Sequence, residues 1–65
     1  MNQQTQIILA GTQAALARHE HDEARAAYWT SHARKMIHLE DNPAAGQAAF
    51  DSAYRAEAQS YRRSF

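Results

Sequence analysis

The dipeptide Asn42-Pro43 is the feature that most constrains the fold of this chain. The Asn42 side chain can accept a hydrogen bond from an unpaired backbone N–H at the start of a helix, and Pro43 suits the first helical position because no donor is needed there. Proline also disfavours helical backbone angles in the residue before it, so an upstream helix must stop near Asp41. The sequence therefore predicts a tight corner, followed by a helix over about residues 43–63.

Composition limits the classes of protein that the chain can belong to. Its 65 residues allow one small domain, and the 15 alanines, with only two glycines, are typical of helices. There is no cysteine, which excludes disulfides and thiolate zinc sites. Seven basic residues balance seven acidic ones, so no overall charge attracts nucleic acid or an anionic membrane. The longest aliphatic run, residues 7–10, is too short to span a bilayer. We expect one all-α, cytoplasmic domain over residues 1–65.

Residues 2–40 carry apolar side chains at helical spacing, interrupted by one polar segment in the middle. One interpretation is a single helix over about residues 3–39, joined by a turn at 40–42 to the second helix as an antiparallel hairpin. The other is a break at residues 19–22, where Asp22 would cap the second helix of a monomeric three-helix bundle. Because residues 19–22 contain no glycine, proline, asparagine or serine, we expect the continuous helix.

The polar segment places His19, Asp22 and Glu23 on the face that should be buried if the helix is continuous. Their spacing, three and four residues from the histidine, could bring an imidazole and carboxylates to one metal ion. A hydrogen-bonded polar layer that fixes the register of the helices explains the same residues without a metal. We expect the structural role and no cofactor, and keep a metal- or pH-responsive dimer as an alternative.

Helix lengths predict a homodimer. A helix over residues 43–63 is roughly 31 Å long, and folded back it covers the first helix only from about residue 18 onward. The N-terminal half of a long first helix would then expose its apolar side chains, which a second copy could cover. The residues expected at this subunit contact are Ile7, Ile8, Leu9, Leu16 and Trp29.

The pattern favours a small interaction protein over an enzyme. Two helices offer few concave sites, and the serines lack the motifs of a nucleophile. We therefore expect a helical homodimer that binds another macromolecule, such as a protein target, and modulates or inhibits it. Such a chain is consistent with a phage- or mobile-element-encoded regulator. The alternative is a nucleic-acid-binding hairpin dimer. That alternative would use Arg34, Lys35, Arg55, Arg62 and Arg63.

Overall fold

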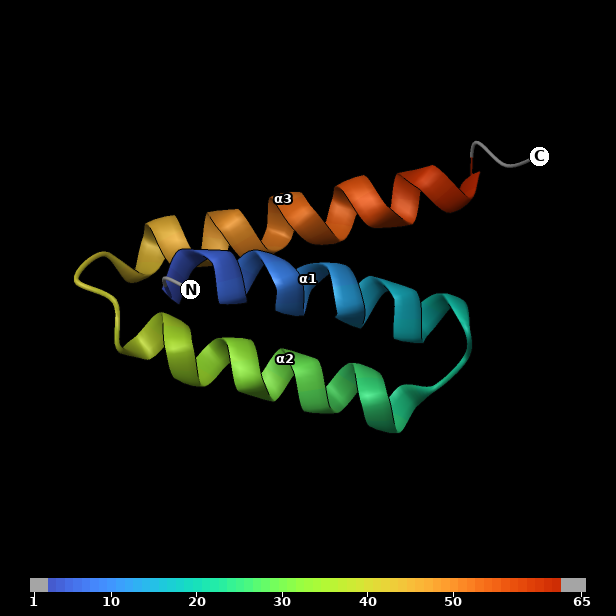
Figure 1. The fold of residues 1–65 in the computed structure, drawn as a ribbon, viewed down its shortest axis with the longest axis horizontal. Helices are drawn as coiled ribbons and strands as arrows, with labels where there is room; N and C mark the ends of the chain where they lie inside the picture. Colours follow the sequence, from blue (N-terminus) through green and yellow to red (C-terminus); the bar gives the residue numbers. More distant parts are fainter. Residues whose placement is uncertain (1–2, 63–65) are drawn as a thin grey trace.

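The computed structural model describes residues 3–62, and in that range it contains three helices. They are α1 (Gln3–His19), α2 (Glu23–His38) and α3 (Pro43–Arg62). The expected all-α class is confirmed. Figure 1 shows α1 between the other two helices, with α2 antiparallel to it and α3 running in the same direction as α1. Helix α1 packs along both neighbours, whereas α2 and α3 approach each other little. The first helix is therefore the centre of an open three-helix bundle.

The expectation of one helix over residues 3–39 is wrong, because the chain turns between His19 and Glu23. His21 has a φ of 61°, and its backbone N–H donates to the Arg18 carbonyl at 3.0 Å. The next N–H, of Asp22, donates to the Ala17 carbonyl at 2.8 Å. This pair of bonds is the Schellman motif that ends many helices, and the residue with positive φ in it is usually glycine. Here His21 occupies that position, so the sequence has no glycine to mark the end of α1.

Asp22 makes the connection short because it serves both helices. Besides closing α1, it is the N-cap of α2, and its carboxylate accepts a hydrogen bond from the Arg25 backbone N–H at 3.1 Å. The second corner forms as the sequence predicts. Asn42 Oδ1 accepts from the Ala45 backbone N–H at 3.3 Å, and α3 begins at Pro43. Both turns use an Asx residue to satisfy a donor that the following helix leaves unpaired.

The core of the bundle is thin. Within residues 3–62, six of the eight buried hydrophobic residues are alanine, and Ile7 is the only large side chain that is fully buried. Small residues let the helices approach closely. A methyl group added at Gly11 of α1 would lie 2.7 Å from the Phe50 carbonyl oxygen of α3, closer than any van der Waals contact. Because alanine buries little apolar area, close packing here stabilises the fold less than a core of large side chains would.

Candidate functional site

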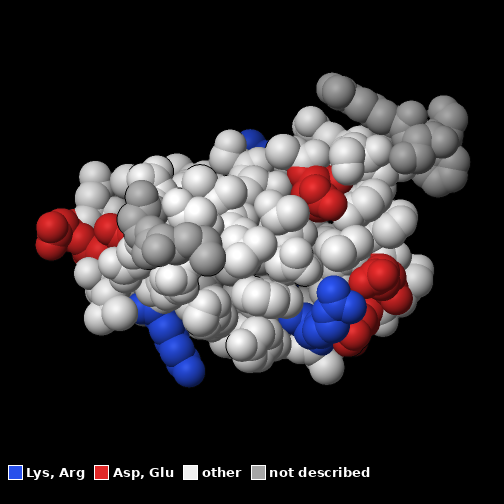
Figure 2. All heavy atoms as spheres, viewed as in Figure 1, with Lys and Arg blue, Asp and Glu red and all other residues white. Residues whose placement is uncertain are grey.

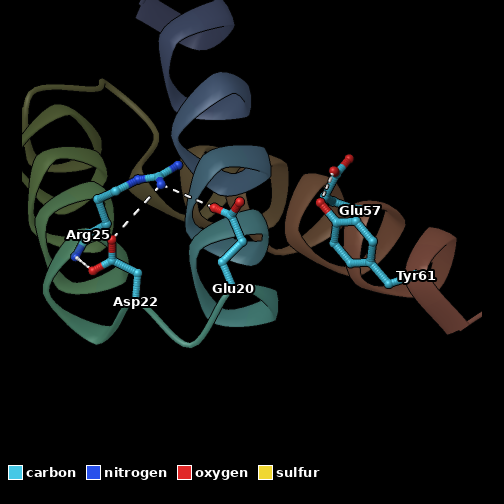
Figure 3. Close-up of polar contacts among 5 residues, drawn as sticks. All are labelled: Glu20, Asp22, Arg25, Glu57 and Tyr61. Atoms are coloured by element: carbon cyan, nitrogen blue, oxygen red, sulfur yellow. Dashed lines mark hydrogen bonds and ion pairs between the residues drawn. The ribbon is translucent and has the colours of Figure 1, made fainter.

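The residues considered for a metal do not form a buried polar layer. His19 and Glu23 are exposed, and the Asp22 carboxylate is used as a helix cap. Figure 3 shows Arg25 between Asp22 and Glu20, with its guanidinium 3.1 Å from the Glu20 carboxylate. Within residues 3–62, no three His, Cys, Asp or Glu side chains gather so that they could hold a metal ion. The turn between α1 and α2 has moved these groups out of the helix packing and to one end of the bundle.

His19 contacts α3 instead. Its ring stacks on Tyr61 with the centroids 3.9 Å apart, and the Tyr61 hydroxyl donates a short hydrogen bond to the Glu57 carboxylate (Figure 3). That hydrogen bond, together with burial and the negative charges of Glu57 and Glu20, raises the pKa of Tyr61 from 10.0 to about 12. Tyr61 therefore stays protonated at physiological pH. The cluster fastens the C-terminal turn of α3 to the end of α1.

The basic residues considered for nucleic acid do not converge. Each of the four that lie in the described range borders a different shallow hollow on the surface. Arg34 lies beside Arg18 and Glu23, Lys35 beside Tyr28 and His32, Arg55 beside Asp51, and Arg62 beside His19 and Tyr61. Arg63 lies outside the described residues. A phosphate backbone needs a continuous basic groove or stripe, and these positions do not form one.

A different surface stands out, along the side of α1 that neither neighbour covers. Ile8 and Leu9 expose 43% and 41% of their surface there, and Leu16 is only half-buried. Thr5, Leu9, Thr12 and Leu16 follow one another at intervals of four, three and four residues, so they lie in one line along the helix. Ile7, expected in the same contact, points inward and is fully buried.

Helix α2 extends this surface with two more apolar side chains. Arg25 reaches Glu20, the residue directly after α1, so the Arg25 side of α2 borders the line of Leu9 and Leu16. Trp29 and Met36 come four and eleven residues after Arg25, so they lie on that same side, and both are half-buried. We name the whole surface the α1 face. It consists of Thr5, Ile8, Leu9, Thr12 and Leu16 of α1 with Trp29 and Met36 of α2.

The α1 face carries no charged residue. Figure 2 shows the uncharged area as a broad white region over α1, with blue and red side chains around it. The Thr12 hydroxyl donates to the Ile8 carbonyl oxygen at 3.1 Å, so it already has a partner inside the helix. An apolar surface could therefore cover Thr12 without leaving an unpaired hydroxyl donor. The geometry suits contact with another protein surface and offers little to a charged ligand.

Sequence reasoning named Ile8, Leu9, Leu16 and Trp29 for a protein contact, and the structure brings these four to one face. It did not name Thr5, Thr12 or Met36, although the four-three-four spacing was readable in the sequence. Comparisons of the chain with protein-family models, with curated proteins and with solved structures found no match. No helix within residues 3–62 combines the length and the apolar content that crossing a bilayer requires.

Proposed function

We propose that the chain is a small, non-enzymatic interaction protein of the cytoplasm that binds another protein through the α1 face and modulates or inhibits it. The observation that carries the proposal is the distribution of large apolar side chains. Among the large apolar side chains of residues 3–62, Ile7 alone is fully buried, while Ile8, Leu9, Leu16, Trp29 and Met36 share one uncharged face. A contiguous apolar patch of this kind is typical of a protein contact.

The homodimer expected from the sequence stays part of this proposal, with a different physical basis. The long first helix, whose N-terminal half would have exposed its apolar side chains, is absent. The α1 face nevertheless leaves apolar side chains exposed, because a 65-residue chain with an alanine core buries little apolar surface on its own. A second copy and a target would contact the same side chains, so each excludes the other from one α1 face.

Nucleic-acid binding is the less favoured function. Its candidate residues border separate hollows, and the 65-residue chain has no net charge. Salt distinguishes the two functions, because contacts to phosphates weaken steeply as salt rises while an apolar protein contact does not.

The test uses capture of partners from a native lysate with three tagged chains: wild type, Leu9→Asp and Ser31→Asp. Ser31 is exposed on another side of α2, beside Arg34, so Ser31→Asp adds the same charge outside the α1 face. A protein that wild type and Ser31→Asp retain at high salt, and that Leu9→Asp loses, supports the proposal. Equal retention by all three chains would contradict it.

A further inference from the structure

We infer that the partner which covers the α1 face in the isolated protein is a second copy of the chain, related by a two-fold axis that passes beside Thr12. The inference rests on the proposed function, in that it names an occupant of the same face. Size is the first argument. The side of the bundle that carries the α1 face measures 40 Å by 22 Å, so it is large enough for the about 800 Å² per partner that a standard interface buries.

Charge is the second argument. The seven residues of the α1 face are uncharged, and two charged residues that border it, Arg25 and Glu20, pair with each other at 3.1 Å. The whole chain has a formal net charge of zero at pH 7, so no long-range repulsion opposes association. An uncharged surface on a protein with no net charge meets no electrostatic repulsion from its own copy.

The spacing of the side chains supplies the geometry. Two α1 helices that pair antiparallel about a point between residues 12 and 13 place Leu9 of each copy opposite Leu16 of the other. Each such leucine pair lies about 5 Å along the helix from the axis, because seven residues span roughly 10.5 Å. Thr12 of the two copies meets at the centre. Its hydroxyl is already bonded to the Ile8 carbonyl, so its methyl group can pack in the contact.

Sedimentation equilibrium of purified wild type and two variants across the micromolar range tests the assembly. We expect wild type to approach about 14.6 kDa, twice the 7.3 kDa of one chain. Leu16→Asp buries two unpaired carboxylates in one two-fold interface, and we expect it to weaken the dimer by roughly 100-fold or more. Ser31→Asp adds the same charge on another side of α2 and should leave the dimer intact. Circular dichroism checks that each variant keeps its helices.

Disulfide cross-linking tests the axis with variants that leave the leucines in place. The chain has no cysteine, so Thr12→Cys supplies one thiol in each copy. Mild oxidation should convert most of it into covalent dimers, because the two thiols meet at the axis. Ser31→Cys is the matched control. Ser31 is exposed on another side of α2, beside Arg34, so this variant should stay mainly uncross-linked.

Each negative result has a distinct meaning. A wild-type chain that stays at 7.3 kDa overturns the inference and leaves the α1 face free for another protein, so the proposed function would stand. A dimer that survives Leu16→Asp and does not cross-link through Thr12→Cys places the interface elsewhere and also overturns it. A dimer that behaves as expected, with Leu9→Asp still capturing every partner from the lysate, overturns the proposed function alone.

Discussion

Alanine substitution of the two helical glycines should have opposite effects on stability. Each replacement gains about 1 kcal/mol from helix propensity. At Gly11 the new methyl group would lie 2.7 Å from the Phe50 carbonyl oxygen and 3.2 Å from the Ala53 Cβ. The nearer atom is backbone, so only a shift of α1 away from α3 can relieve the clash. Overpacking of this kind costs about 1–3 kcal/mol, and we expect the upper part of that range here. The net result is a loss of about 1–2 kcal/mol for Gly11→Ala.

Gly46 offers the matched comparison in α3. A methyl group there would meet Ile37 Cγ1 at 3.3 Å, Ile7 Cδ1 at 3.5 Å and Glu40 Cγ at 3.6 Å. All three are side-chain atoms that can move by a few tenths of an ångström, so most of the propensity gain is kept. We expect Gly46→Ala to raise stability by about 0.5–1 kcal/mol.

Thermal and urea unfolding followed by circular dichroism measures both variants under the same conditions. For a domain of this size, a change of 1 kcal/mol moves Tm by about 4–8 °C, so the two variants should be well separated on either side of wild type. A Gly11→Ala chain as stable as wild type or more so would refute the close approach of α1 and α3. Equal effects of the two substitutions would refute the distinction between backbone and side-chain neighbours.

Three further predictions concern the turns and the end of α3. His21→Gly should stabilise the chain by about 0.5–1 kcal/mol, because glycine adopts the positive φ at His21 without strain; a lower urea midpoint would contradict this. Asn42→Ala should lower stability by about 0.5–2 kcal/mol through loss of the cap on the Ala45 N–H, whereas an unchanged midpoint would show that this cap contributes nothing. Because the hydrogen bond to Glu57 raises the pKa of Tyr61 to about 12, the stability that it adds is present below pH 10.0 and lost as pH rises through about 12. The free energy of unfolding of wild type should therefore fall more steeply than that of Tyr61→Phe over that pH range. Coincident profiles of the two chains would show that the Tyr61–Glu57 hydrogen bond adds no stability.

The parts of the fold that could be predicted from the sequence were those with a local signal. Asn42 and Pro43 form the corner by interactions within a few residues, so the pattern alone was enough. The break after His19 has no such signal, because His21 occupies a position where glycine is usual. Missing that break led to the wrong prediction of a buried polar layer at His19, Asp22 and Glu23, which instead lie at a turn.

The candidate site was predictable only in part, because exposure depends on how three helices pack. The apolar character of Ile8, Leu9 and Leu16 is visible in the sequence. The sequence prediction exposed them because a short second helix could not cover a long first one, whereas in the structure they lie on the side of α1 that neither neighbour covers. Which of two adjacent isoleucines points inward depends on where α2 and α3 lie around α1. The structure buries Ile7 and leaves Ile8 43% exposed, a distinction that no local pattern encodes.

The most direct test of the α1 face as the contact surface is a dilution series followed by methyl NMR of the isoleucine and leucine side chains. If a second copy covers this face, the methyl signals of Ile8, Leu9 and Leu16 should shift together as the concentration falls through the dissociation constant. The signals of Ile37, which is buried within one chain, should stay constant. Constant signals of Ile8, Leu9 and Leu16 over the whole range would contradict the account.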